Sequence, residues 1–333
     1  MIHVEKAGLL TTVQDLGRSG SQHLGVPVSG AMDEFAHRTA NLLVGNQETD
    51  ATLEITLNGP TLRFERDALI SICGGNLSPS IDAQEIPMGR PLVVRRGSRL
   101  KFGAVRYGCR SYLAVEGGLK VDCILGSRST CLRASFGGFS GRALRAGDTL
   151  PFDEPSLEIF PDLRKQLRDG KQAWVRADWF LAHPIQSVNH ETALIHVTAG
   201  PQMEWFSEES QKQFIEQTYT ISDHSDRMGY RLSGEPITLT KQRDLLSEGV
   251  AFGTIQIPAD GQPIVLMADH ATTGGYPKIA NVAAADLPIV AQLAPHRRLK
   301  FELIPLSISQ KMLVTREHIL NQLRLNLAAR RGS

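Results

Sequence analysis

The first half of the chain consists mainly of short apolar-rich runs separated by turn residues. The 333 residues include 30 glycines and 17 prolines, so turns are frequent. Runs of this kind are typical of strands, and their close spacing favours sheets closed into barrels or sandwiches. The pattern therefore predicts a mainly β (α+β) fold with few helices. The runs are "ATLEITL", "TLRFE", "ALISIC", "PLVVRRG", "RLKFG" and "RSYLAVEGG".

Helical spacing is clear in two places. Residues 31–44 carry apolar side chains that recur on one face, which predicts a helix with Ser29 as its N-cap and Gly45 as its C-terminal stop. In the tail "TREHILNQLRLNLAARR", helical spacing brings a second apolar set together, which either docks on its own domain or meets a partner. The second set is Ile319, Leu320, Leu323 and Leu327.

Four segments follow from these patterns. Residues 1–153 form an N-terminal β-rich half with one helix, and residues 154–190 form a charged connector that we expect to be partly helical. Residues 191–310 form a second β-rich half, and residues 311–333 a helical tail. The string "RLKF" occurs at 99–102 and again at 298–301, which suggests that the two halves are related.

Composition excludes several classes of protein. Lys plus Arg number 36 against 35 for Asp plus Glu, so a nucleic-acid partner is not expected. No apolar run approaches the ~18 residues of a membrane helix, and the N-terminus lacks the pattern of a secretory signal. The four cysteines form no C-x-x-C pair and no histidine cluster has zinc spacing, so we expect no metal and a cytoplasmic protein.

One loop, "TTGGYPK", combines hydroxyls, glycines and a lysine as phosphate loops do. A Walker loop, however, needs Gly-Lys-Ser/Thr between a strand and a helix, whereas Lys278 follows Tyr276-Pro277. We therefore interpret the loop as a Gly-Gly turn that lets backbone approach a ligand. Thr272 and Thr273 could then donate hydroxyls, and Lys278 could neutralise an anion. The alternative is a tight turn with a solvated lysine.

Further polar residues lie at strand ends and turns. Asp269 ends the apolar strand that precedes the loop, and "SDRMGY" places Ser225 and Asp226 beside Arg227. An Arg–Asp pair at a turn is commonly structural, but Arg227 together with Lys278 would suit a carboxylate or carbonate group.

Two other stretches also place polar side chains where a ligand could bind. Gln256 lies inside an apolar strand, where its amide must be paired with a ligand or with backbone. The glycine-rich loop before the first helix adds Gln14, Asp15, Arg18 and Ser29, which either tie the loop together or edge a ligand site.

The sequence contains no G-x-S-x-G elbow and no G-x-G-x-x-G between a strand and a helix. It does contain longer segments that resemble the allophanate hydrolase subunit two family, also called the biotin-dependent carboxyltransferase-like or KipA family. The resemblance extends from about Leu9 to Leu303. Its segments are "TTVQDLGRSG", "GVPVSGAMD", "ANLLVGN", "LEITLNGP", "YLAVEGG", "LGSRST", "SDRMGYRLSG", "IQIPADGQPIVLMAD" and "TTGGYPKIA".

The resemblance implies a fold and an activity. It implies cyclophilin-like β-barrel units and a site formed with a KipI-like partner subunit. Family members include one subunit of the bacterial ATP-dependent 5-oxoprolinase, a complex that also contains a LamB/YcsF-like subunit. That complex opens 5-oxoproline to glutamate while it hydrolyses ATP.

Other members are half of the carboxyltransferase domain of urea carboxylase, and one branch antagonises a KipI-like kinase inhibitor. These two remain as alternatives: a carboxyltransferase half acting on urea or a related amide, and a regulatory protein. This chain lacks the biotin attachment sequence, so a biotin carrier would be separate.

The resemblance places "TTGGYPK", with Tyr276, at the border of the ligand cleft, and ATP at a site shared with a partner. The expected catalytic group is Asp269, Lys278 and Arg227. The expected substrate-binding residues are Thr272, Thr273, Gly274, Gly275, Tyr276, Gln256, Ser225, Asp226, Gln14 and Arg18.

Overall fold

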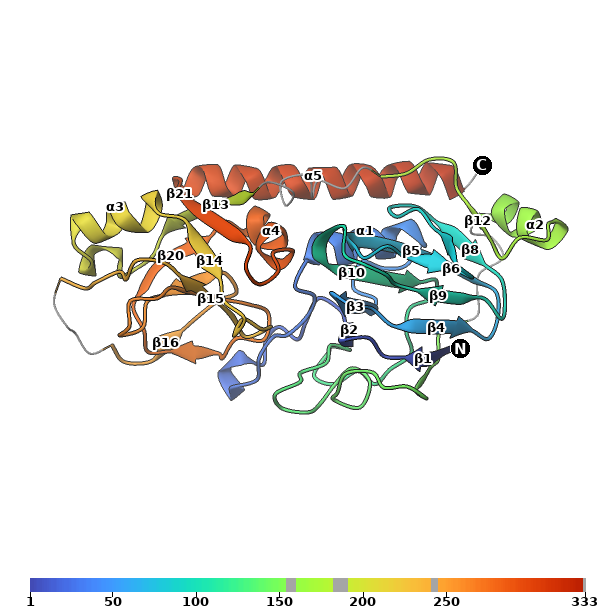
Figure 1. Cartoon of the computed structure of the whole chain (residues 1–333), viewed down its shortest axis with the longest axis horizontal. Coiled ribbons are helices and arrows are strands. Elements are labelled where there is room, and N and C mark those ends of the chain that lie inside the picture. Colours follow the sequence, from blue (N-terminus) through green and yellow to red (C-terminus); the bar gives the residue numbers. More distant parts are fainter. Residues whose placement is uncertain (154–159, 182–190, 241–244, 332–333) are drawn as a thin grey trace. The chain divides into compact units, whose positions relative to one another are not determined.

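A computed structural model describes residues 1–153, 160–181, 191–240 and 245–331 (Figure 1). The chain divides into two compact units, and neither is one continuous stretch of sequence. Unit 1 comprises residues 1–18, 33–185 and 320–333, and unit 2 comprises residues 19–32 and 186–319. Each unit is described below by itself.

Unit 1 contains two six-stranded sheets. The first has the order β11-β1-β4-β9-β6-β7 and the second the order β12-β8-β5-β10-β3-β2. The first sheet consists of β1 (Ile2–Lys6), β4 (Thr61–Phe64), β6 (Ser80–Ile81), β7 (Gln84–Glu85), β9 (Arg99–Lys101) and β11 (Thr149–Leu150). The second consists of β2 (Leu10–Gln14), β3 (Thr52–Thr56), β5 (Ala68–Asn76), β8 (Leu92–Val94), β10 (Tyr107–Val115) and β12 (Trp174–Arg176).

The hydrophobic core of unit 1 takes alternate residues from both sheets. In β3, Leu53 and Ile55 belong to this core, while Thr52 and Glu54 point to the opposite face because strand side chains alternate. The same alternation in β10 puts Leu113 in the core and Tyr112 on the other face. The second sheet therefore has one apolar face and one face that carries buried polar groups.

Helix α1 (Glu34–Leu43) packs on β5 and β10. It begins three residues later than predicted, and Ser29 is not its N-cap. The cap is Asp33, whose carboxylate accepts a hydrogen bond from the Ala36 backbone N–H at 2.8 Å and so satisfies one of the free donors of the first turn. Gly45, with φ of +86°, follows the helix and confirms the predicted stop.

The connector contributes to unit 1. Helix α2 (Pro161–Asp169) and strand β12 lie in its described part, and β12 pairs with β8. The partly helical character predicted for this segment is therefore confirmed over its described residues. Phe160 and Trp179 contact each other with ring centroids 6.1 Å apart. Residues 154–159 and 182–190 of the predicted connector lie outside the described residues.

Unit 2 is built on a closed seven-stranded barrel with the order β13-β20-β17-β18-β15-β14-β21 (Figure 1). Its strands are β13 (Thr192–Ala199), β14 (Tyr219–Ile221), β15 (Gly229–Ser233), β17 (Thr254–Gln256), β18 (Ile264–Leu266), β20 (Lys278–Val282) and β21 (Arg298–Leu303). Closure leaves the barrel no free sheet edge. A separate two-stranded sheet joins β16 (Glu248–Gly249) to β19 (Thr273–Gly274).

Aromatic side chains pack together in one part of the barrel core. Phe214 of α3 (Glu208–Glu216) stacks on Phe301 of β21 at 4.8 Å, and Tyr219 lies 5.4 Å from Phe301. A short helix, α4 (Leu287–Ala291), precedes β21. The predicted sheet-rich class with few helices is thus confirmed. Both copies of "RLKF" lie in strands, β9 and β21, but the sheets that contain them differ in construction.

Helix α5 (Leu306–Arg331) supplies residues to both units. Of the predicted apolar set, Leu320, Leu323 and Leu327 are buried, whereas Ile319 is exposed. Spacings of three and four residues align the buried three along one narrow stripe, and Ile319 lies about 100° away from Leu320 on the helix.

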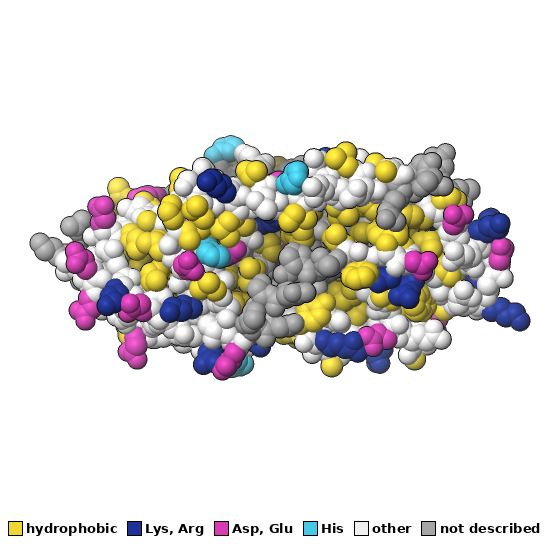
Figure 2. Space-filling model, turned by 90° about the horizontal axis from the view of Figure 1, so that it is seen from above, with side chains coloured by type: hydrophobic (Ala, Val, Ile, Leu, Met, Phe, Trp, Pro, Cys, Tyr) yellow, Lys and Arg dark blue, Asp and Glu magenta, His cyan; other side chains and the backbone are white. Residues whose placement is uncertain are grey.

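Charged side chains of both signs are interspersed on the face shown in Figure 2. This arrangement fits the near-zero net charge of the chain. In the described part of the chain, no helix is both long enough and apolar enough to cross a membrane. All four cysteines are free thiols.

His37 on α1 makes the stability of unit 1 depend on pH. Burial lowers the pKa of His37 from 6.5 to about 4, and its ring contacts the Thr52 hydroxyl at 2.9 Å and the Glu48 carbonyl at 3.1 Å. Between these two pKa values the unfolded chain binds the proton and the folded chain does not, so stability falls as the pH falls. The unfolding free energy should drop by about 2 kcal/mol from pH 7 to pH 5.

Urea denaturation at the two pH values measures this effect. The His37→Gln variant should lose the His37 share of the pH dependence, because glutamine has no proton to bind. An unchanged pH slope in that variant would show that other groups are responsible.

Candidate functional site

Lys278, at the start of β20, is buried and paired. Its side chain is 6% exposed, and its ammonium lies 2.6 Å from a carboxylate oxygen of Glu248, whose side chain is 46% exposed. The Lys278 backbone N–H donates to the Gln202 side chain at 3.1 Å. The backbone of Lys278 is therefore fixed within the buried strand, and its ammonium pairs with a carboxylate that is half exposed to solvent.

The strand β16 that carries Glu248 pairs with β19 of the predicted ligand loop. Glu248 lies opposite Gly274, and Gly249 opposite Thr273. A Cβ at Gly274 would lie 2.4 Å from the amide nitrogen of Gln256, so a larger residue there would displace that amide. That amide contacts the Tyr276 carbonyl at 3.4 Å, so Gln256 is paired with loop backbone, one of its two expected roles.

The loop does not have the setting of a Walker loop. It joins β19 to β20, so it runs from strand to strand and not from strand to helix. Thr273, Gly275 and Tyr276 are exposed at the surface. The loop also lines a pocket of about 450 Å³. Gly275, Tyr276 and Pro277 form part of its wall, together with Ile237, Ile257 and Pro258.

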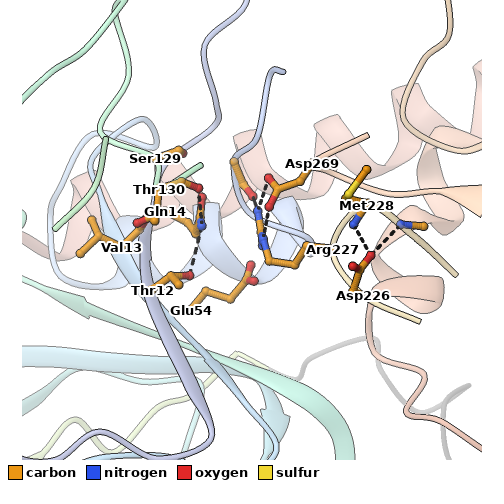
Figure 3. Close-up of polar contacts among 12 residues, drawn as sticks. Thr12, Val13, Gln14, Glu54, Ser129, Thr130, Asp226, Arg227, Met228 and Asp269 are labelled. Atoms are coloured by element: carbon orange, nitrogen blue, oxygen red, sulfur yellow. Dashed lines mark hydrogen bonds and ion pairs between the residues drawn. The ribbon is translucent and has the colours of Figure 1, made fainter. Parts of the chain in front are cut away.

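Arg227 and Asp269 form a second buried ion pair (Figure 3). Two guanidinium nitrogens of Arg227 lie 2.9 and 3.1 Å from the two carboxylate oxygens of Asp269, which is the bidentate geometry that favours this pairing. A further guanidinium N–H donates to the Gly30 carbonyl at 2.6 Å. Arg227 thereby fastens the segment 19–32 to the barrel within unit 2.

The neighbouring polar residues support the turn that carries Arg227. The Asp226 carboxylate accepts from the backbone N–H groups of Met228 and Gly229 at 2.7 and 3.2 Å (Figure 3). The Ser225 hydroxyl accepts from the Arg231 N–H at 3.0 Å. These contacts correspond to the structural interpretation that the sequence left open.

The structure thus places the three residues of the predicted catalytic group in two distinct ion pairs. Arg227 pairs with Asp269, and Lys278 pairs with Glu248 rather than with Asp269. The two cations therefore have different carboxylate partners. A ligand anion at Lys278 would meet one ammonium that already has a carboxylate beside it.

In unit 1, Asp15 and Arg18 tie loops together. The Asp15 carboxylate accepts from the hydroxyl groups of Ser127 and Ser129 at 2.7 and 2.5 Å, and from the backbone of Gly17 and Arg128. Arg18 is 1% exposed and donates to the Ser129 carbonyl.

Three adjacent strands align a polar row that the sequence did not predict. Thr12 of β2 lies opposite Glu54 of β3, and Glu54 lies opposite Tyr112 of β10. The Tyr112 hydroxyl donates to the Glu54 carboxylate at 2.8 Å and accepts from the Asp33 N–H at 2.8 Å. Burial raises the pKa of Tyr112 well above its ordinary value, so its hydroxyl keeps its proton and donates to Glu54.

Gln14 continues this row along β2. Its amide nitrogen donates to the Thr12 hydroxyl at 3.1 Å and to the Thr130 carbonyl at 3.2 Å (Figure 3). Arg110, next to Tyr112 along the same face, lies 3.9 Å from Glu54. A signal for this row was present in the sequence, because "LEITL" and "CRSYLAV" place Glu54 and Arg110 inside otherwise apolar strands.

Within the described ranges, no group of three or more histidine, cysteine, aspartate and glutamate side chains could hold a metal ion.

Comparison with known proteins shows which family the chain belongs to. The family described as "Carboxyltransferase domain, subdomain A and B" matches residues 24–303. The chain belongs to this carboxyltransferase family. The match covers the described parts of the barrel and the polar row from β3 onward, and it includes both ion pairs of unit 2.

Two curated relatives carry the same name, that of the C subunit of 5-oxoprolinase. The chain is 39% identical to the relative from Escherichia coli, over 88% of each chain. It is 35% identical to the relative from Haemophilus influenzae, over 97% of this chain and 98% of that protein. Identity at this level over nearly full length confirms the resemblance found in the sequence.

A solved structure and a further curated relative, both named for urea, also match this chain. The crystal structure of Kluyveromyces lactis urea carboxylase matches 97% of this chain with a TM-score of 0.84 and 30% identity, over 29% of its own length. The urea amidolyase of Saccharomyces cerevisiae is 33% identical over 92% of this chain, which corresponds to 17% of that larger protein.

The buried pair of Arg227 and Asp269 gives a prediction about stability. Asp269→Asn should lower the unfolding free energy by about 3–5 kcal/mol, because it leaves a buried guanidinium without its charge partner. The double variant Arg227→Met/Asp269→Leu should recover part of this loss, since it removes both charges of this ion pair. Urea denaturation of the three proteins measures the difference. A double variant less stable than Asp269→Asn would contradict the argument.

Proposed function

We propose that this chain is the C component of an ATP-dependent 5-oxoprolinase that opens 5-oxo-L-proline to L-glutamate. The observation that carries the proposal is the end-to-end match to a relative of that name, with 97% of this chain aligned to 98% of the relative. The three curated relatives named for urea are several times longer, and this chain corresponds to less than a quarter of each.

The reaction requires more functional groups than a single polar loop supplies. Resonance stabilises the lactam, so water must be helped to attack its carbonyl carbon, and the ring nitrogen must take a proton as the C–N bond breaks. The substrate also carries a carboxylate, which needs a cationic partner. We propose that Lys278 supplies this partner at the end of the "TTGGYPK" loop. Its position next to exposed loop residues, and to Pro277, which lines a pocket, supports the proposal.

The ion pair with Glu248 affects how Lys278 could bind the substrate carboxylate. A carboxylate ligand would have to share or replace the contact that Glu248 makes with the Lys278 ammonium. Because Glu248 is half exposed, it can turn to solvent at low cost, whereas the buried lysine cannot. The ion pair would therefore keep the lysine charged and positioned until the ligand arrives.

ATP does not fit this loop on its own. A triphosphate calls for several backbone N–H donors and more than one cation, and the loop offers one ammonium that is already paired. We propose that the nucleotide, whose hydrolysis would drive the unfavourable lactam opening, is bound mainly by a partner protein. The proposed partners are a KipI-like subunit together with a LamB/YcsF-like subunit in the cytoplasm.

A second candidate is the carboxyltransferase half of a urea or amide carboxylase. It is favoured by the structural match to urea carboxylase over 97% of this chain. In this case Lys278 would hold a carboxylate delivered by biotin from a separate carrier protein. Assaying the purified complex for biotin-dependent carboxylation separates it from the first candidate.

The first prediction of this proposal is dependence on partner subunits. The purified chain alone should release no glutamate from 5-oxoproline and ATP, because its loop offers one ammonium, already paired, and too few donors for a triphosphate. The chain assembled with its KipI-like and LamB/YcsF-like partners should do so only when ATP is present. Turnover by the single chain at the rate of the complex would refute the dependence.

The second prediction concerns Lys278. In the assembled complex, Lys278→Ala should lower kcat/KM for 5-oxoproline about ten- to a hundredfold, because one charge-assisted hydrogen bond is lost. The Glu248 carboxylate left behind is half exposed to water, but the Lys278 side chain is 6% exposed, so a fall in thermal stability from the lost methylene packing is expected and is measured separately. Lys212→Ala is the matched control, because that side chain is 72% exposed and lies on α3.

Pull-down of the partner subunits and thermal melting accompany the assay of both variants. Near-normal turnover of a properly assembled Lys278→Ala complex would make the lysine a structural partner of Glu248 only. A variant that no longer assembles would assign Lys278 to an interface between subunits instead.

A further inference from the structure

Unit 1 contains a pocket of about 410 Å³ that the proposed function does not use. Its wall is formed by α1, by residues 45–49 and by the last turns of α5. Leu16, Leu42 and Leu327 supply apolar surface, and every lining residue belongs to unit 1. Pockets of this size, mainly apolar with a few polar groups, are typical of small-molecule sites.

Two opposite charges in the pocket wall lie close together without forming a hydrogen bond. Glu48 Oε1 is 3.8 Å from Arg324 Nε, which is too long for one. The other carboxylate oxygen, Oε2, accepts from Arg38 Nε at 2.5 Å. In the described part of the chain, Glu48 Oε1 and the Arg324 guanidinium have no hydrogen-bond partner. An open acceptor and an open donor therefore lie side by side in this pocket.

The two groups differ in how firmly they are held. The Glu48 side chain is 16% exposed and is fixed by Arg38, whereas the Arg324 side chain is 57% exposed and can turn. A guanidinium binds a carboxylate through two parallel N–H donors, and a carboxylate oxygen accepts strongly from an ammonium. A ligand that carries both a carboxylate and an ammonium would satisfy both groups at once.

The surroundings restrict the ligand further. Because Arg38 is already paired with Glu48, a second negative charge on the ligand would meet the Glu48 carboxylate without a free cation. Helix α1 ends at Leu43, between the pocket residues Leu42 and Gly45, and the negative end of its dipole also disfavours a ligand that is only anionic. The apolar wall suits an uncharged aliphatic group.

We propose that this pocket binds an aliphatic α-amino acid, such as leucine, as its zwitterion. Arg324 holds the carboxylate, Glu48 Oε1 accepts from the ammonium, and the aliphatic side chain packs on Leu16, Leu42 and Leu327. The ligand would link Glu48, which follows α1, to Arg324 of α5. It would thereby fasten the last turns of α5 to unit 1 and raise the melting temperature of the chain.

A series of leucine analogues tests the site on the wild-type chain. The full-length protein is titrated calorimetrically with L-leucine, with isocaproate, which lacks the ammonium, with isoamylamine, which lacks the carboxylate, and with glycine, which lacks the aliphatic side chain. Leucine should bind saturably at one site, and each analogue should bind about tenfold or more weakly than leucine. Isocaproate that binds as well as leucine would overturn the proposal, and so would the absence of saturable binding of leucine and of valine.

Three variants locate the binding. Arg324→Met keeps an unbranched side chain without the guanidinium, and it should weaken leucine binding about tenfold or more. Ala328→Trp should abolish binding, because Ala328 is an exposed residue of the pocket wall and the indole would fill the space. Lys311→Met is the matched control, because it removes an exposed cation of the same helix outside the pocket and should leave binding unchanged. Leucine binding that is unchanged in both pocket variants would overturn the assignment.

A measurement on the wild-type chain covers the case in which the pocket variants do not fold. With isotopically labelled arginine, the side-chain N–H signal of Arg324 should shift when leucine is added, and an unshifted signal would overturn the site. This inference goes beyond the proposed function and can fail separately from it. Leucine binding without ATP-dependent glutamate formation refutes the proposed function alone, and the reverse refutes this site alone.

Discussion

A buried charge must be paired, and this constraint governs both units. In unit 2, the buried Arg227 lies in the turn before β15, and its guanidinium is matched by Asp269 and by the Gly30 carbonyl. Because Gly30 belongs to residues 19–32, the Arg227 guanidinium contacts both Asp269 and a segment that is distant in sequence. Removing Asp269 takes the carboxylate partner away from a buried guanidinium, which is costly in a region of low dielectric. The position of that segment is thus a consequence of electrostatics as much as of apolar packing.

The sequence predicted the strands well, and for a clear physical reason. Each of the six apolar-rich runs chosen from the first half contains a strand, because burial on one or both faces of a sheet leaves a direct trace in residue type. The start of α1 was misplaced because Ser29 and Asp33 are both good N-caps, and only Asp33 has the geometry to accept from the first turn. Local pattern does not choose between two adequate caps.

Partners of polar side chains were less predictable. Lys278 and Asp269 are close in sequence, yet strand pairing gives each a different partner, and Glu248 reaches Lys278 through the pairing of β16 with β19. The row of Thr12, Glu54 and Tyr112 depends on the register of three strands that are far apart in the chain. Register is a tertiary property, so a single sequence shows the polar residues but not their row.

The two units are interleaved along the chain, since residues 19–32 of unit 2 separate two pieces of unit 1, and α5 contributes to both. A cut between residues 185 and 186 would not release two complete domains. The N-terminal fragment would keep the segment that Arg227 holds, and the C-terminal fragment would keep Leu320, Leu323 and Leu327, which belong to unit 1. Each fragment would carry a piece that completes the other, so the two should recover their structure by complementation and not as independent modules.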